Sequence, residues 1–212
     1  MLKPSFDLTY EKIHGNQENK IYTEMWKSAD RSKGFPVFLL YDELLDELLE
    51  ENLYEGEADI EAYLHQREEE ESEFLDADYI MGNPDDTAEG IYEFSSFEIQ
   101  DDADIFLVNV TVENPWQIFE KLPFGAYNEC PAPNILSAFS KMTYEKFGAV
   151  PAVISSDTLE FAVSRRPSKQ EAFGLAQQMY LLCPDIVDQG YGSIYALADC
   201  LTKSDIWFFW WD

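Results

Sequence analysis

The chain has 212 residues, of which 46% are hydrophobic and 26% are charged, and its formal net charge at pH 7 is −28. This length and apolar content predict one folded core. It contains no apolar run of 18 residues and no signal-peptide pattern at its N-terminus, so we expect a cytoplasmic protein without a membrane partner.

The negative charge is concentrated in the middle of the chain. Of the 42 acidic residues, 25 lie between residues 41 and 104, beside a single basic residue, Arg67. Such a field repels nucleic acid, because phosphate binding needs a basic surface that displaces counterions. It attracts a basic protein, and it equally suits a solvated face that only keeps the protein in solution. Composition leaves these two roles open.

The cysteines argue against a disulfide framework and against a zinc site. Cys130, Cys183 and Cys200 are an odd number at wide spacing. We expect reduced, mostly buried thiols, and no cofactor.

Hydrophobic periodicity predicts the elements of the first half. Residues 35–41 are a short apolar run behind Gly34, which indicates a buried strand. The next segment, about 42–52, is predicted to be an acidic amphipathic helix. Its apolar face is formed by five leucines: Leu44, Leu45, Leu48, Leu49 and Leu53.

A second helix is predicted from Ala58 to Leu75, with Ile60, Tyr63 and Leu64 turned inward. Glycine and Asn-Pro mark residues 81–90 as a loop. Two strand-like runs follow, at 91–99 and 104–112.

The second half carries clearer start and stop signals. Asn114 and Pro115 indicate a helix start, Gly148 indicates the end of a helix over 134–147, and Ser168 with Glu171 forms a capping box. The remaining predicted elements are a hairpin built from 150–154 and 158–164, helices over 168–183 and 193–203, and a terminal aromatic strand at 206–211.

These elements predict an α+β fold with a single mixed sheet and flanking helices, because strands and helices mix without a strict βαβ repeat. We expect residues 1–104 to be an N-terminal part that contains the acidic helical segment and packs on the same core. Residues 105–212 are expected to form the main domain, with the C-terminal aromatic strand in its sheet.

Catalytic motifs of the common enzyme classes do not occur. The chain has no G-x-S-x-G, no P-loop, no Rossmann glycine pattern and no H-E-x-x-H. What remains is a set of acids at turn or strand positions, which are weak catalytic candidates: Glu129, Asp157, Glu160, Asp185 and Asp188. Such oxygen ligands suit magnesium or calcium, and a pair could act as acid and base, but equally they could cap turns through the backbone.

Four blocks of the second half resemble a known family. They are LPFGAYNECP (122–131), FGAVPAVISSDTLEFAV (147–163), LLCPDIVDQGYGSIYALA (181–198) and the terminal WFFWWD. In this order they resemble the bacterial domain-of-unknown-function family numbered 4253, over roughly residues 105–212. The resemblance implies a small bacterial protein and carries no catalytic residue, cofactor or substrate. Tyr127 departs from the tryptophan expected there.

The terminal strand is apolar on both faces. Alternation sends Ile206, Phe208 and Trp210 to one face and the residues between them to the other, so a central or well-covered strand is expected. The alternative is a strand exposed on one face, whose apolar patch would mark a binding site. Asp212 adds two negative charges at its end. These need water or a basic partner such as Arg165 or Arg166.

Two functions are compatible with these observations, and behind them stands a third possibility, a structural or regulatory module with no dedicated ligand. The leading one is a non-enzymatic acidic binding protein, immunity or antitoxin-like, that captures a basic protein. Its predicted partner-binding residues are the acidic run Glu68, Glu69, Glu70 and Glu71. The alternative is a carboxylate-based enzyme, metal-dependent or not, that uses the five acids named above.

Overall fold

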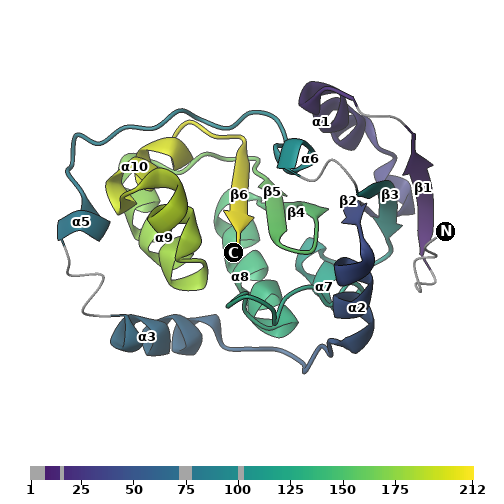
Figure 1. The fold of residues 1–212 in the computed structure, drawn as a ribbon, viewed down its shortest axis with the longest axis horizontal. Helices are drawn as coiled ribbons and strands as arrows, with labels where there is room; N and C mark the ends of the chain where they lie inside the picture. Colours follow the sequence, from purple (N-terminus) through teal and green to yellow (C-terminus); the bar gives the residue numbers. More distant parts are fainter. Residues whose placement is uncertain (1–7, 15–16, 72–77, 100–102) are drawn as a thin grey trace.

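The computed structural model describes residues 8–14, 17–71, 78–99 and 103–212. Its strands are β1 (Thr9–Ile13), β2 (Phe35–Tyr41), β3 (Asp104–Val110), β4 (Val150–Ile154), β5 (Thr158–Ala162) and β6 (Ile206–Trp210). They form one six-stranded sheet in the order β1-β3-β2-β4-β5-β6 (Figure 1). The central pair, β2 and β4, is parallel, and the four other pairs are antiparallel. The predicted α+β fold with a single mixed sheet is confirmed.

The larger core lies on one face of the sheet. There Leu39, Leu159, Phe161, Trp207 and Phe209 pack with the buried side chains of the main helices. These helices are α8 (Pro133–Phe147), α9 (Lys169–Leu182) and α10 (Ile194–Leu201). Large aromatic side chains dominate this core, and each removes roughly 150–250 Å² from water.

A smaller aromatic core covers the opposite face. Tyr22 and Trp26 of α1 (Asn19–Ser28) pack there with Phe38, Phe94 and Phe97. The rings of Tyr22 and Phe97 stack with their centroids 3.9 Å apart. Neither β1 nor α1 is predicted from the sequence, and β1 is short and largely exposed.

The acidic helix is confirmed as α2 (Glu43–Glu51). Asp42 caps its start by accepting a hydrogen bond from the Leu45 amide, 2.7 Å away. Leu45 and Leu49 are buried, but Leu53 is 74% exposed, so its predicted place on the apolar face is wrong. The reason is that the backbone becomes extended at Asn52 and the helical period stops before Leu53.

The second predicted helix is α3 (Ile60–Glu70), which begins after the cap Asp59 and has Glu71 as its C-cap. Part of its predicted end, 72–75, lies outside the described residues. Leu64 is buried in the larger core, as expected. Further on, α5 spans Asp78–Met81.

The strand predicted at 91–99 is wrong, because α6 (Ser96–Ile99) occupies its end. The amides of Ser95 and Ser96 donate hydrogen bonds to the Glu160 carboxylate instead of joining a strand ladder.

The second half follows its start and stop signals. Asn114 precedes a 3₁₀ turn, η2 (Pro115–Gln117), and the short α7 (Ile118–Lys121). Gly148 ends α8 in the left-handed conformation, with φ 63°. The capping box at the start of α9 is confirmed, as is the hairpin of β4 and β5. The segment after α9, expected only as a break, contains a π-helical turn, η3 (Ile186–Tyr191).

The terminal strand β6 lies at an edge of the sheet and not at its centre. Trp207, Phe209 and Trp211 are buried in the larger core, while Phe208 and Trp210 are only half-buried. The outer edge is partly covered, because the Cys183 thiol donates to the Trp210 carbonyl, 3.0 Å away.

The end of the chain does not use the basic partners considered for it. Arg165 pairs with Glu171, and Arg166 pairs with Asp205. Asp212 is exposed, and its amide donates to the Asp185 carboxylate, 3.1 Å away.

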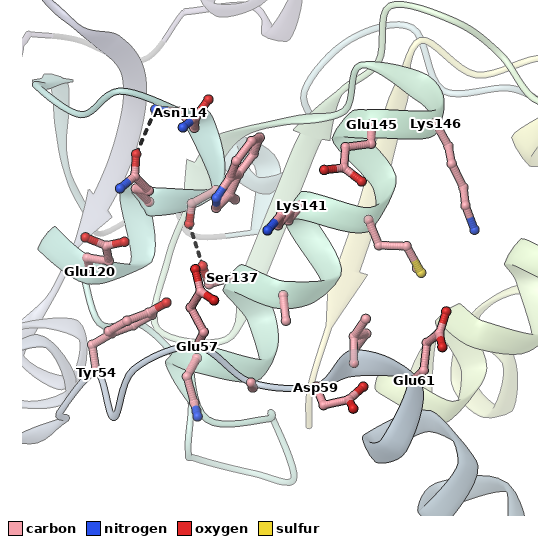
Figure 2. Close-up of a pocket in the computed structure, with 17 residues that line it drawn as sticks. Tyr54, Glu57, Asp59, Glu61, Asn114, Glu120, Ser137, Lys141, Glu145 and Lys146 are labelled. Atoms are coloured by element: carbon pink, nitrogen blue, oxygen red, sulfur yellow. Dashed lines mark hydrogen bonds between the residues drawn. The ribbon is translucent and has the colours of Figure 1, made fainter.

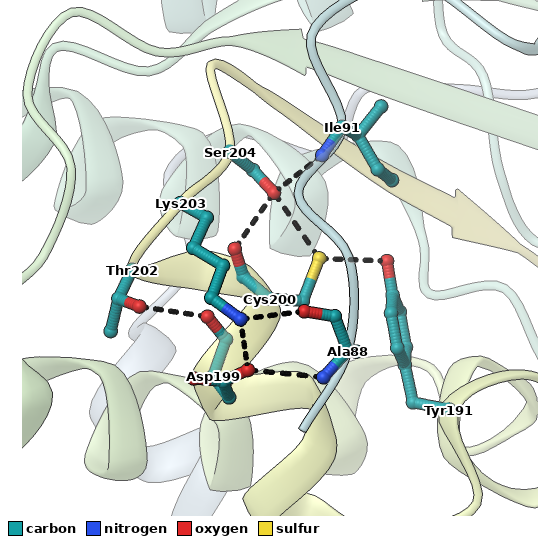
Figure 3. Close-up of polar contacts among 8 residues, drawn as sticks. All are labelled: Ala88, Ile91, Tyr191, Asp199, Cys200, Thr202, Lys203 and Ser204. Atoms are coloured by element: carbon teal, nitrogen blue, oxygen red, sulfur yellow. Dashed lines mark hydrogen bonds and ion pairs between the residues drawn. The ribbon is translucent and has the colours of Figure 1, made fainter.

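The acidic segment of the first half, which contains α2, α3, α5 and α6, runs around the outside of the second half (Figure 1). Figure 3 shows the hydrogen bonds that hold residues 88–91 beside α10. The Ala88 amide donates to Asp199, Lys203 donates to the Ala88 carbonyl, and the Ile91 amide donates to the Ser204 hydroxyl. Residues 88–91 are thus held through polar contacts to the second half.

Packing of α2 predicts a clear difference between two of its leucines. Leu45→Ala should lower the free energy of unfolding by about 2–5 kcal/mol, because Leu45 is fully buried. Leu53→Ala is the matched control and should change it by less than about 0.5 kcal/mol. Urea denaturation measures both, and equal effects would contradict the packing described.

Candidate functional site

The candidate site is a groove between α8 and the connection from α2 to α3 (Figure 2). Its volume is about 840 Å³, within the range of ligand sites in proteins. Its floor comes from α8 and η2, and one wall comes from residues 54–61. Its charged and aromatic lining residues are Tyr54, Glu57, Asp59, Glu61, Trp116, Glu120, Lys141, Glu145 and Lys146.

The wall is anchored at both ends. Before it, the Asn52 side-chain amide donates to the Gly125 carbonyl, 2.7 Å away. After it, Asp59 caps α3 and Leu64 is buried in the larger core. The connection between these anchors therefore crosses α8 with a fixed path.

The floor presents a polar stripe of α8. Asn134, Ala138, Lys141 and Glu145 recur at a spacing of three or four residues and so share one face of the helix. Ser137, which is 2% exposed, donates from its hydroxyl to the Trp116 carbonyl, 2.9 Å away. This bond fixes η2 against α8.

The groove has an excess of negative charge. Five carboxylates and two ammonium groups line it. Asp59 is used as a helix cap, but within the described residues no hydrogen bond or ion pair engages the carboxylates of Glu57, Glu61, Glu120 and Glu145. Four glutamates are thus available to an external cation.

The acidic run of α3 has a different environment. Glu70 and Glu71 form ion pairs with Arg67 at 3.2 and 2.9 Å, and hydrogen bonds from Gln66 and Arg67 lower the pKa of Glu70. Glu68 and Glu69 are exposed beside His65. Half of this predicted binding surface already has a cationic partner in the chain.

Among the five weak catalytic candidates, Glu129 lies in a strained exposed turn. The Cys130 amide donates to the Tyr127 carbonyl, 2.8 Å away, and the residues between them, Asn128 and Glu129, have φ of 46° and 60°. Two consecutive positive φ angles define a type I′ turn, which glycine normally favours.

Asp157 and Glu160 come together in a buried polar cluster. Glu160 is fully buried and accepts hydrogen bonds from the Ser96 amide at 2.8 Å and the Ser96 hydroxyl at 2.6 Å. Thr158 donates to the Ser96 hydroxyl and lies 2.7 Å from the Ser155 hydroxyl, which donates to Asp157. Burial raises the pKa of Glu160 to about 7, although its hydrogen bonds act in the opposite direction.

Asp185 and Asp188 lie at the π-helical turn. Asp185 accepts from the Gln189 side chain, 2.9 Å away, and from the amide of Asp212. Burial, followed by the charges of Asp185 and Glu71, raises the pKa of Asp188. Asp185 thus serves local contacts, one of them to the last residue of the chain.

These five acids do not line the groove. In the part of the chain that the structure describes, no group of three or more His, Cys, Asp or Glu side chains is placed to hold a metal ion. The three cysteines are free and buried, and burial raises the pKa of Cys130. The groove presents carboxylates and aromatic side chains to solvent.

The comparisons with known proteins identify the second half. The family model named Domain of unknown function (DUF4253) matches residues 106–212. The chain belongs to the DUF4253 family. None of the curated proteins and none of the solved structures matches it. None of the helices in the described ranges is both long and apolar enough to cross a membrane.

The DUF4253 match divides the groove into two parts. Trp116, Glu120 and α8 lie inside the matched region, whereas the wall at residues 54–61 lies outside it. This site is not predicted from the sequence, because no local pattern indicates that the connection crosses α8. The polar stripe of α8 is a signal that could have suggested it.

The buried Glu160 predicts a pH dependence of stability. The pKa of Glu160 in the folded protein, about 7, exceeds its value of 4.5 when exposed. Its contribution to the free energy of unfolding is therefore fully present below about pH 4.5 and is lost as the pH rises through 7. Compared with the Glu160→Gln variant, the free energy of unfolding of the wild-type protein should therefore fall by on the order of 3 kcal/mol between pH 4.5 and 8. Urea denaturation of both proteins across this range measures the difference, and a constant difference would contradict the assignment.

The turn at Glu129 predicts a stabilising substitution. Glu129→Gly should raise the free energy of unfolding by about 0.5–1 kcal/mol, because glycine adopts positive φ without a steric cost. Glu113→Gly, at an exposed position without positive φ, is the control and should not stabilise. Thermal unfolding compares them; a loss of stability at residue 129 would show that its side chain makes a contribution that the turn geometry does not reveal.

Proposed function

We propose that this protein is a non-enzymatic binding protein that captures a basic protein, and that the groove holds a lysine- or arginine-rich segment of that partner. The observation that carries the proposal is the set of four groove glutamates without a partner among the described residues: Glu57, Glu61, Glu120 and Glu145. A carboxylate without an internal partner binds a cation without first breaking an ion pair.

The long-range field supports the same function. A net charge of −28 attracts a basic partner and raises the rate of encounter. The groove then supplies a fixed place where the encounter complex can become specific. This division between a diffuse field and a defined site is typical of charge-steered complexes.

The groove is favoured over the acidic run of α3 for a physical reason. Binding at Glu70 or Glu71 competes with Arg67, which holds both carboxylates. The four groove glutamates have no internal cation to displace among the described residues. The run from Glu68 to Glu71 remains a prediction for the partner surface, and in this proposal it contributes mainly to steering.

The finer proposal is an immunity or antitoxin-like role in a bacterial cytoplasm, with a basic toxin or nuclease as the partner. It is supported by the charge of the chain. A gene for a basic toxin next to the gene for this chain would be expected. A neighbourhood without one in related genomes would count against this role but not against binding itself.

Two variants with the same loss of charge test the proposal. The groove variant replaces Glu57, Glu61, Glu120 and Glu145 with Gln, and the control variant replaces Glu68, Glu69, Glu70 and Glu71 with Gln. The probe is a fluorescent peptide of alternating arginine and glycine. The groove variant should weaken binding at least about tenfold and flatten its salt dependence, while the control should weaken it less than about threefold.

Fluorescence anisotropy gives the dissociation constants, and thermal unfolding checks that both variants are folded. Equal losses would mean that the field attracts the peptide without a site. An unchanged affinity in both variants would overturn the proposal.

A further inference from the structure

One aromatic ring in the groove already carries a cation from the chain itself. The Lys141 ammonium lies 5.8 Å from the centroid of the Trp116 ring, within the range of a cation–π contact. Figure 2 shows Lys141 on α8 among the residues that line the groove. Lys141 is exposed, and within the described residues it forms no ion pair with a carboxylate.

The turn that carries the indole is held in place within the free protein. Ser137 holds the Trp116 carbonyl, and the Asn114 amide donates to the Gln117 side chain, 2.9 Å away, across the same turn. The Tyr144 ring packs on Trp116 with the centroids 5.5 Å apart. Trp116 nevertheless stays half-buried, so part of its ring remains open to the groove.

The two cationic groups of the groove are therefore not equivalent. Lys141 lies over the tryptophan, whereas Lys146 lines the groove without a ring contact among the described residues. Both sit on α8, five positions apart, and both carry one positive charge. A long flexible lysine stem exchanges easily between a ring face and water.

We propose that the face of Trp116 is a subsite for an arginine or lysine side chain of the basic partner, and that Lys141 occupies this subsite in the free protein and leaves when the partner binds. The inference rests on the proposed function of the groove. It adds that Trp116 binds the cationic side chain and that Lys141 competes with this side chain for the face of the ring. Arginine is preferred, because its planar guanidinium stacks on an indole and an ammonium does not.

A matched pair of substitutions tests the competition. Lys141→Met and Lys146→Met each remove one positive charge from the same groove, so charge alone predicts equal gains in affinity for the arginine–glycine peptide. The proposal predicts a further gain of about two- to fivefold for Lys141→Met, which is the range expected for an exposed cation–π contact. The corresponding lysine–glycine peptide should gain less.

Substitutions of Trp116 provide a second test of the subsite. In a Trp116→Leu background the additional gain of Lys141→Met should disappear, and the preference for arginine over lysine should fall. Trp116→Phe keeps an aromatic ring and should retain part of both, and it replaces the leucine variant if that variant does not fold. Thermal unfolding of each variant is the check.

The outcomes separate this inference from the proposed function. Equal gains for Lys141→Met and Lys146→Met, with the dependence on the groove glutamates intact, would overturn the subsite alone. A wild-type protein that binds neither peptide would overturn both. A direct readout is the ε-methylene signal of Lys141 in an NMR spectrum, which should lose its ring-current shift when the arginine–glycine peptide is added, and an unchanged shift at saturation would overturn the displacement.

Discussion

The parallel pairing of β2 with β4 joins the two halves of the chain, and the groove depends on it. In the sheet order, β2 stands between β3 and β4, so the strands of the DUF4253 region are continuous only when a strand from the first half is inserted. Strand edges left open by its absence would carry unpaired backbone groups. Because β2 leads directly into α2, the same pairing places the connection at residues 54–61 over α8.

Once the first half is tied into the sheet, its charge has to be accommodated around a common core. The described acids follow two patterns. Some make contacts close by in the chain: Asp42 and Asp59 cap helices, and Glu71 forms an ion pair with Arg67. Others project into the groove without a cation. Self-repulsion favours any partner that supplies positive charge, so the surplus acts as a source of binding energy as well as of solubility.

Polar groups are also placed inside the molecule, on the smaller face of the sheet. Glu160 is buried there among aromatic residues, and the serine amides and hydroxyls around it supply its hydrogen bonds. A buried acid is acceptable only with such partners. The arrangement fixes residues 94–97 over the sheet and explains why that segment, with apolar residues suited to a strand, does not form one. On β6, which pairs with the strand of Glu160, Trp210 is only half-buried.

The sequence by itself determined the local elements whose signals lie within a few residues: the caps at Ser168 and Asn114, the stop at Gly148, the hairpin, and the apolar period of α2. It also determined the charge and, through four ordered blocks, the family. The tertiary structure alone decided which strands are neighbours, that the terminal strand is an edge, and that residues from 54–61, η2 and α8 enclose one groove. The physical reason is that pairing of β2 with β4 and packing of Leu64 join residues far apart in the chain, and no local pattern records where such segments meet.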